Sequence, residues 1–261
     1  MRTAWNSPFE ARGPGRYIHD MNSSVEAPPA LWTPDDFIAR LRAVGERQYH
    51  DKHPLHVRMN AGALSPRQVR GWVANRFYYQ RNIPIKDAAI ISSCPVREVR
   101  RLWLHRITDH DGVADGEGGI EAWLGLGEAA GMARDELLDD RHVLPGVRFA
   151  VDAYVTLART SPWPIAVASS LTELFAPDLM AERIAAFERH YRWVADAGLA
   201  YFRSRVSRAR TDSSEGLQLT LAYCGTVALQ RQAVRALSTK CDILWAMLDA
   251  MDAAYGREAI S

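Results

Sequence analysis

The chain has little cysteine and no long apolar run. It holds three cysteines, Cys94, Cys224 and Cys241, and no two of them form a C-x-x-C pair. This spacing excludes a disulfide framework or a zinc knuckle and indicates buried free thiols in a reducing compartment. No apolar run reaches membrane-spanning length, and residues 1–30 lack the apolar segment of a signal peptide. We therefore expect a cytoplasmic protein that does not bind a membrane.

The chain also has no excess of positive or negative charge. Its 32 Lys and Arg residues nearly balance 31 Asp and Glu residues, for a formal net charge of +1 at pH 7. Such a balance argues against nucleic-acid binding through bulk electrostatics, so any functional positive charge must be local. Apolar residues make up 48% of the 261 residues, which is enough for the core of one large globular domain.

Alternating β-branched runs bounded by hairpin turns are scarce, whereas apolar residues recur at spacings of three and four. The pattern predicts an all-α domain over residues 31–261, preceded by a flexible leader in the Pro- and Gly-containing residues 1–30. One helix should begin after Thr33 as N-cap, and another after Ser65, with Gln68 completing a capping box. Further helices are expected near residues 95–110, 118–131, 146–160, 164–175, 178–194, 196–209, 214–235 and 237–255.

The helix that follows Ser65 places cationic and polar side chains among aromatic ones. Its shared face comprises Trp72, Arg76, Tyr79, Gln80 and Ile83. Pro84 lacks an N–H group and clashes with the preceding turn, so we expect it to disrupt the helix and to turn Lys86 inward.

Other predicted helices repeat this placement of a cation in an apolar stripe. The residues concerned are Arg106 with His110, Arg183 near Phe187, Tyr201 with Arg205, and Lys240 between Leu237 and Leu244. A single Lys or Arg of this kind usually extends its charged end to water. Several of them, with few carboxylates on the same stripes, predict an internal pocket for a small polyanion, because Arg binds carboxylates through two hydrogen bonds.

Two competing kinds of site are weaker. His50, His53 and His56 are loosely spaced and interrupted by a proline, which favours a surface or capping role over metal binding. A diiron bundle needs paired Glu-x-x-His motifs, and Glu173 has no His three residues later. The Gly-rich stretch at residues 112–121 has the composition of a loop between helices and does not match a nucleotide-binding motif. We expect no metal.

Seven blocks of the sequence closely resemble the pyrroloquinoline-quinone (PQQ) synthase family over about residues 33–255. They are "GWVANRFYYQ", "IPIKDAAI", "RITDHDG", "GGIEAWL", "HVLPGVRFAVDAY", "SSLTELFAP" and "KCDILWAMLDAM". The resemblance implies a single compact seven-helix bundle of the haem-oxygenase-like and thiaminase-like type, and a homodimer. It also implies O2-dependent ring closure and eight-electron oxidation of an amino-acid-bearing dioxo-hexahydroquinoline dicarboxylate to PQQ, with release of hydrogen peroxide. Members of this family use no metal and no organic redox cofactor.

The resemblance also assigns the site. The family's pocket residues correspond to Tyr49, His50, Arg76, Gln80, Lys86, Arg106, His110, Tyr154, Arg183, Tyr201, Arg205 and Lys240. By this resemblance His110 is the general acid or base, Tyr201 and Arg205 flank the oxygen site, and the remaining residues bind substrate and product. Met180 stands where many members have a histidine at the oxygen pocket, and a thioether cannot shuttle protons.

Two alternatives remain open at this stage. One is a metal-dependent oxidase on the same scaffold, which would need clustered His and carboxylate ligands in the pocket. The other is a carrier that binds PQQ without catalysis, for which His110 and the Tyr201–Arg205 pair would be superfluous.

Overall fold

The computed structural model describes residues 30–256, except for the side chains of Ser207, Ala209 and Arg210. This part of the chain contains eleven α-helices, three 3-10 helices and no strand, which confirms the all-α prediction. The expected number of seven helices is wrong, even when the short helices α2, α6 and α8 are set aside. Most of the predicted leader lies outside the described residues, so its flexibility stays a prediction.

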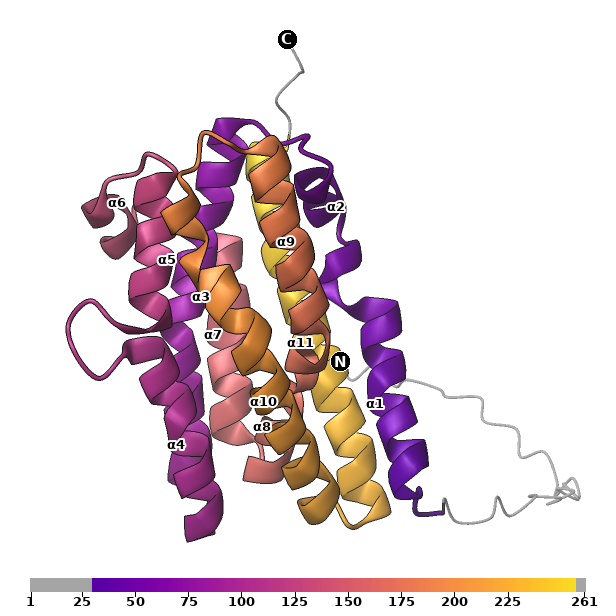
Figure 1. Ribbon diagram of the computed structural model, residues 1–261. Helices are drawn as coiled ribbons and strands as arrows, with labels where there is room; N and C mark the ends of the chain where they lie inside the picture. Colours follow the sequence, from indigo (N-terminus) through magenta and orange to yellow (C-terminus); the bar gives the residue numbers. More distant parts are fainter. Residues whose placement is uncertain (1–29, 257–261) are drawn as a thin grey trace, which may run out of the picture. The chain divides into compact units, whose positions relative to one another are not determined.

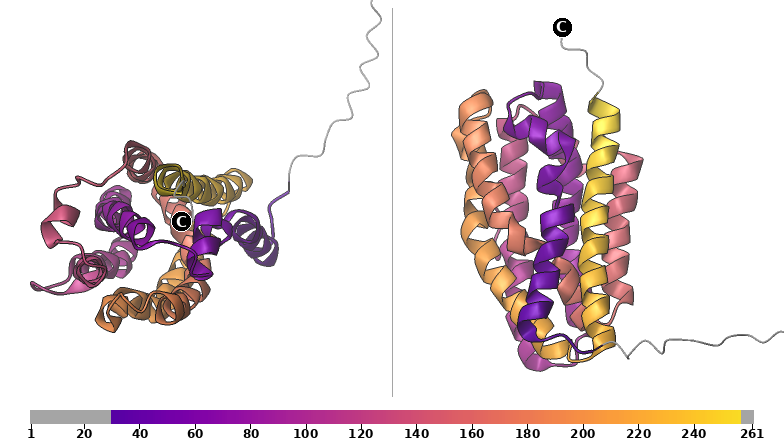
Figure 2. Two further views of the ribbon diagram at one scale, coloured as in Figure 1. Left: turned by 90° about the horizontal axis from the view of Figure 1, so that it is seen from above. Right: turned by 90° about the vertical axis from the view of Figure 1, so that its right-hand side faces the viewer.

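The long helices run alongside one another (Figure 1), and the view from above shows them grouped as a bundle (Figure 2). The α-helices are α1 (Pro34–Gln48), α2 (Pro54–Asn60), α3 (Pro66–Ser93), α4 (Arg97–Asp111), α5 (Gly118–Ala129), α6 (Arg134–Leu138), α7 (Pro145–Thr160), α8 (Trp163–Ser169), α9 (Ala176–His190), α10 (Ala200–Tyr223) and α11 (Val227–Tyr255). The 3-10 helices are η1 (His50–Lys52), η2 (Ser170–Phe175) and η3 (Asp196–Leu199). Helix α3 packs against α4, α5 and α7, whereas α11 packs against α1, α7 and α8.

The predicted helix starts are confirmed by their capping bonds. The Thr33 hydroxyl accepts a hydrogen bond from the Asp36 backbone N–H over 3.2 Å. The Ser65 hydroxyl accepts from the Gln68 N–H, and the Gln68 side chain accepts in return from the Ser65 N–H over 2.8 Å. These bonds satisfy N–H groups that the helix itself leaves without acceptors.

Pro84 does not interrupt α3, which continues unbroken to Ser93. The proline removes one bond of the helical ladder, and packing of α3 against α4, α5 and α7 holds the helix together. Lys86 nevertheless points inward and is 2% exposed. The reason differs from the one expected: an unbroken helix places Lys86 three residues after Ile83, on the same face.

The predicted helices in the last third of the chain have the wrong boundaries. Helix α10 crosses the polar residues around Asp212 without a break, although two separate helices were expected there. The break falls instead before α11, where the Thr226 hydroxyl accepts from the Leu229 N–H over 3.2 Å. Asp212 is buried and ion-paired, so tertiary contacts outweigh the modest helix propensity of this segment. Similarly, the predicted helix over 164–175 is divided into α8 and the 3-10 helix η2.

The three cysteines are buried and free, as predicted. Within residues 30–256, none of the helices has the length and apolar character that crossing a bilayer requires.

Candidate active site

Two adjoining cavities lie inside the bundle. The larger, of about 60 Å³, is lined by Tyr49, His50, Arg76, Tyr79, Ile83, His110, Thr172, Glu173, Ala176, Met180, Tyr201, Arg205 and Leu244. The smaller, of about 20 Å³, is lined by His50, His56, Trp72, Arg76, Gln80, Trp123, Leu179, Met180, Arg183, Tyr201 and Phe202. Because His50, Arg76, Met180 and Tyr201 belong to both linings, we describe them as the main lobe and the inner lobe of one site.

Most of the predicted site residues line one lobe or both. These are Tyr49, His50, Arg76, Gln80, His110, Met180, Arg183, Tyr201 and Arg205. The structure does not place Lys86, Arg106, Tyr154 or Lys240 on the wall of either lobe. Each of these four contacts residues that line a lobe or that pack behind its lining, as described below.

Arg76 is a cation without a counter-charge. Its guanidinium carbon lies 4.0 Å from the centroid of the Tyr79 ring, one turn along α3. Within residues 30–256, no carboxylate forms an ion pair with Arg76. The neighbouring Gln80 accepts a hydrogen bond from the Tyr201 hydroxyl over 2.8 Å, so its carbonyl is already engaged. Arg76 therefore remains available to an anionic ligand.

Lys240 lies behind Tyr79 and is fully buried. Its ammonium group donates to the Tyr79 hydroxyl over 2.9 Å and sits 3.2 Å from the centroid of the Tyr154 ring. No carboxylate in the described part of the chain pairs with it. Burial, and then the charge of Arg76, hold the pKa of Lys240 well below its usual value. Lys240 thus places a second basic group behind the main lobe, and a bound anion would favour its charged form.

Arg183 is the third cation of this kind, on the wall of the inner lobe. It is 2% exposed, contacts the Met59 sulfur and lies over the Trp72 ring at 5.3 Å. Burial, and then the charge of Arg76, lower the pKa of Arg183 to about 10. Even so, it is charged at neutral pH.

His110, near the end of α4, has the geometry of a general base. Its Nδ1 lies 3.1 Å from the Arg106 backbone carbonyl, which can only accept, so Nδ1 carries the proton. Nε2 then carries the lone pair, and this buried atom has no hydrogen-bond partner among the described residues. Burial, and then the charge of Arg205, lower the pKa of His110 to about 4. The imidazole is therefore neutral at pH 7 and able to accept a proton.

Tyr201 and Arg205 lie one turn apart on α10, and both line the main lobe. Burial raises the pKa of the Tyr201 phenol, although Arg205 opposes the effect, so the hydroxyl keeps its proton. Arg205 donates to Asp212 over 2.9 Å and lies 4.0 Å from Glu173. Tyr201, Arg205 and His110 therefore line the same space.

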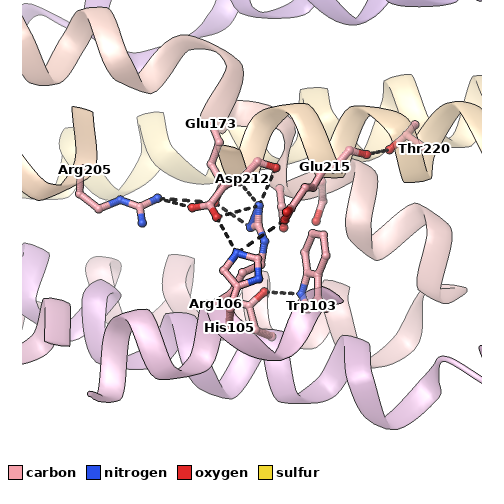
Figure 3. Close-up of polar contacts among 12 residues, drawn as sticks. Trp103, His105, Arg106, Glu173, Arg205, Asp212, Glu215 and Thr220 are labelled. Atoms are coloured by element: carbon pink, nitrogen blue, oxygen red, sulfur yellow. Dashed lines mark hydrogen bonds and ion pairs between the residues drawn. The ribbon is translucent and has the colours of Figure 1, made fainter. Parts of the chain in front are cut away.

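Three of the predicted cations are paired with carboxylates, contrary to expectation: Arg205 with Asp212, as described above, and Arg106 and Lys86. Arg106 makes two hydrogen bonds to Glu173 and stacks on Trp103 at 3.9 Å (Figure 3). Lys86 lies 2.5 Å from an oxygen of Asp87. Helical periodicity shows which residues share a face of one helix, and it cannot show that Glu173 of η2 meets Arg106. The partner of Lys86 is its own neighbour on α3, whose side chain also accepts a hydrogen bond from Trp103.

Lys86 and Tyr154 meet at a single hydroxyl of η2. The Lys86 ammonium donates to Ser170 Oγ over 3.0 Å, and the Tyr154 hydroxyl lies 3.3 Å from the same oxygen. The Tyr154 ring stacks on Tyr79 with centroids 6.2 Å apart. Lys86 and Tyr154 therefore support the wall of the main lobe through Ser170 and Tyr79.

Sequence reasoning missed several wall residues. Tyr79 and Ile83 were on the predicted α3 face, so the signal for them was present. Glu173 was considered only as a metal ligand, whereas it lines the main lobe beside Arg106 and Arg205. Burial raises its pKa, although Arg106 opposes the effect. The aromatic wall of the inner lobe comprises Trp72, Trp123 and Phe202. In the sequence these residues cannot be distinguished from aromatic residues of an ordinary hydrophobic core.

The three histidines near residue 50 are buried, so the surface role expected for them is wrong. A capping role is correct for His53, whose Nδ1 accepts from the Leu55 N–H over 3.1 Å. Nδ1 of His56 lies 3.0 Å from the His50 carbonyl and 3.1 Å from His50 Nδ1. Burial, and then Arg76 for His50 and Arg183 for His56, lower the pKa of both imidazoles.

Within residues 30–256, one group of side chains has the composition of a metal site. Ligand atoms of His105, Asp109 and Asp212 lie within 4.8 Å of one another. Arg205 binds Asp212 over 2.9 Å, and Arg208 lies 3.5 Å from Asp109, so both carboxylates already have cationic partners. None of the three residues lines either lobe. The donor set therefore does not fit a metal-dependent oxidase that acts in this cavity.

Comparisons with known proteins agree with the fold and with the blocks of sequence. The model of the TENA/THI-4/PQQC family matches residues 38–250. The pyrroloquinoline-quinone synthase of Cronobacter sakazakii is 56% identical over 225 residues, which cover 86% of this chain and 89% of that protein. The Pseudomonas aeruginosa protein of the same name is 54% identical over 223 residues, covering 85% of this chain and 89% of that protein.

Two solved structures show the same fold at low sequence identity. A TenA homolog from Pseudomonas syringae pv. tomato has a TM-score of 0.64 at 15% identity, covering 87% of this chain and 98% of that chain. A domain with a heme oxygenase-like fold from Shewanella denitrificans has a TM-score of 0.71 at 10% identity, covering 87% and 95%. The predicted haem-oxygenase-like architecture is thus confirmed.

Proposed function

Because the chain belongs to the TENA/THI-4/PQQC family, we propose that it makes PQQ by O2-dependent oxidation of a ring-open precursor. The precursor is an amino-acid-bearing dioxo-hexahydroquinoline dicarboxylate, which undergoes ring closure and an eight-electron oxidation. The high identity to named pyrroloquinoline-quinone synthases over most of the chain supports this reaction.

One observation carries the proposal within the structure. His110, whose buried Nε2 has no hydrogen-bond partner among the described residues, and Arg76, which has no ion-pair partner among them, both line the main lobe. Arg76 is only half-buried, and a bound polycarboxylate supplies the counter-charge that it lacks among the described residues. A neutral imidazole beside the bound ligand is suited to accept a proton from it.

The cations have different roles in ligand binding, which depend on their positions. Arg76 and Arg183 contact carboxylates directly, because both line the cavity and neither has an ion-pair partner within residues 30–256. Lys240 acts through the Tyr79 hydroxyl, whereas Lys86 is paired with Asp87 and holds Ser170 behind the wall. Arg106 fixes Glu173, whose other neighbour is Arg205.

His110 removes protons from the substrate as electrons leave it. Tyr201 and Arg205 flank the dioxygen: Tyr201 donates a proton, and Arg205 stabilises the developing negative charge. Each O2 that takes two electrons and two protons from the substrate leaves as hydrogen peroxide. The quinoid substrate carries the electrons, so neither metal nor organic redox cofactor takes part. Met180 belongs to both lobes and supplies no proton, which leaves Tyr201 as the phenolic donor at this wall.

The lobes are smaller than the 300 to 1,000 Å³ of usual ligand sites, so the substrate must displace side chains when it binds. His50, Arg76, Met180 and Tyr201 adjoin both lobes, so movement of these side chains would merge them. We further propose that the protein acts in the cytoplasm as a homodimer, without nucleic acid or membrane as a partner.

The experiment that tests this function compares His110→Ala with the unaltered protein. The variant should bind PQQ and precursor normally, because Nε2 makes no contact that the free protein needs. It should fail to oxidise the precursor in a single turnover with O2. Unchanged turnover would remove His110 from the role of base, and binding of PQQ without oxidation by either protein would indicate a carrier.

A further inference from the structure

Behind the main lobe, polar side chains of α4, η2 and α10 form one connected group (Figure 3). We call it the α4–α10 network, and its members are His105, Arg106, Glu173, Arg205, Asp212 and Glu215. Of these six, Glu173 and Arg205 line the cavity. The side chain of His105 at the other end is 36% exposed. The network thus connects solvent with the wall at which dioxygen is proposed to react.

Asp212 accepts hydrogen bonds from the guanidinium groups of both Arg205 and Arg106. Its Oδ2 accepts from Arg205 Nη2 over 2.9 Å, and its backbone carbonyl accepts from Arg106 Nη2, also over 2.9 Å. Asp212 is 3% exposed. Burial by itself would raise the pKa of Asp212, but Arg106 and Arg205 outweigh burial and lower it. The carboxylate is therefore charged and buried between two arginines.

His105 holds the remaining oxygen of this carboxylate. Its Nε2 lies 3.1 Å from Asp212 Oδ1, and its Nδ1 contacts the Leu102 backbone carbonyl. Both oxygens can only accept, so both ring nitrogens must donate, and only the imidazolium form has two N–H groups.

The surroundings of His105 favour this charged form. Glu215 Oε2 lies 3.6 Å from Nε2, and Asp109 is within the same cluster of ligand atoms. Among the nearby cations, Arg106 is bound to Glu173, Arg205 is bound to Asp212, and Arg208 lies 3.5 Å from Asp109. Burial lowers the pKa of His105, but the bonds to Asp212 and Leu102 and the charge of Glu215 outweigh it and raise the pKa.

We propose that Asp212 is the positioning residue for Arg205, and that protonated His105 holds Asp212 in the orientation that Arg205 requires. This inference rests on the proposed oxidase function. Apart from Asp212, the carboxylate near Arg205 is that of Glu173, 4.0 Å away and already engaged by Arg106. Without the charge of Asp212, Arg205 moves toward Glu173 and away from the position in which it faces the dioxygen. A displacement of this kind slows the chemical step more than it weakens substrate binding.

The first test is the kinetics of Asp212→Asn, which keeps the shape of the side chain and removes its charge. We expect kcat to fall on the order of 10- to 100-fold, with a smaller change in the dissociation constant of PQQ. The matched control is Asp109→Asn, the same change in the same cluster at a carboxylate that faces Arg208. A folded Asp212→Asn protein with unchanged kcat would overturn the proposal, and so would an equal loss in the control.

The first readout of the second test does not depend on activity. An NMR titration should show His105 losing its proton at higher pH in the unaltered protein than in Asp212→Asn. If Asp212→Asn does not fold, His105→Gln replaces it. In the unaltered enzyme kcat should decrease as the pH rises and His105 loses its proton, and in His105→Gln this decrease should be absent. Identical titration curves, or identical pH profiles, would overturn the proposal. Absence of oxidation in the unaltered protein would instead contradict the proposed function, and the titration would still decide the role of Asp212.

Discussion

The ammonium group of Lys240 lies 3.2 Å from the centre of the Tyr154 ring. Two π faces, those of Tyr154 and Tyr79, surround this buried cation in place of a carboxylate. An aromatic ring attracts a cation without neutralising it, so the positive charge remains available to a ligand. Arg76 over Tyr79 and Arg183 over Trp72 repeat the arrangement.

Binding of PQQ should therefore be accompanied by proton uptake. In the free protein the pKa of Lys240 is lowered, so the ammonium is partly deprotonated toward alkaline pH, and a tricarboxylate raises its pKa again. Calorimetric titration in two buffers of different ionisation enthalpy measures the uptake. Lys240→Met should reduce the uptake, whereas Lys52→Met, at a side chain 46% exposed, should leave it unchanged. The same proton count in Lys240→Met and the unaltered protein would contradict this role for Lys240.

Arg76→Ala should weaken binding without unfolding the protein. A hydrogen bond to a charged group contributes about 1.5–3 kcal/mol, so the dissociation constant of PQQ should rise roughly 10- to 100-fold. The melting temperature of the free protein should be unchanged or higher, because the substitution removes an uncompensated charge. Fluorescence titration and thermal unfolding measure the two effects, with the exposed Arg101→Ala as control. A loss of stability with binding intact would contradict the assignment.

The buried histidines should make the protein less stable in mild acid. The pKa of His110 is about 4 in the folded state and about 6.5 when unfolded, so the unfolded chain binds more protons between these values. The free energy of unfolding therefore falls as the pH drops through 6.5, by about 2 kcal/mol at pH 5 from His110 alone. Urea unfolding at pH 7 and pH 5 measures this difference, which should be smaller in His110→Gln. An equal pH effect in both proteins would show that His110 is not desolvated.

Met180→His should change the oxidation steps and leave product binding intact. The side chain lies on both lobes beside Tyr201, so an imidazole there adds a proton donor at the oxygen wall. Rapid-scan absorbance after oxygen is admitted should show faster decay of intermediates in the variant. Met180→Leu is the matched control for volume. Identical time courses for the His and Leu variants would mean that Met180 only fills space.

The sequence predicts the site best where one helix supplies several of its residues. Arg76 and Gln80 follow from the face of α3, and Tyr201 and Arg205 follow from one turn of α10. The partner of Arg106 could not be predicted in this way, because Glu173 reaches it from a different element across 67 residues.

Helix boundaries were predicted least well at Pro84 and Asp212, where packing and ion pairs override local preference. The same limit applies to the buried histidines. His50 and His56 are held by their contact with each other and by the surrounding walls, and a spacing of six residues through a proline does not reveal this.

The central claim is that the protein oxidises the precursor with O2 and without a metal. The most direct measurement mixes metal-stripped protein with the ring-open precursor under anaerobic conditions, admits oxygen, and follows absorbance and peroxide. The account predicts that the quinone spectrum and hydrogen peroxide develop without added iron. Binding of the precursor with no oxidation until iron is restored would contradict it, and binding of finished PQQ alone would leave only a carrier.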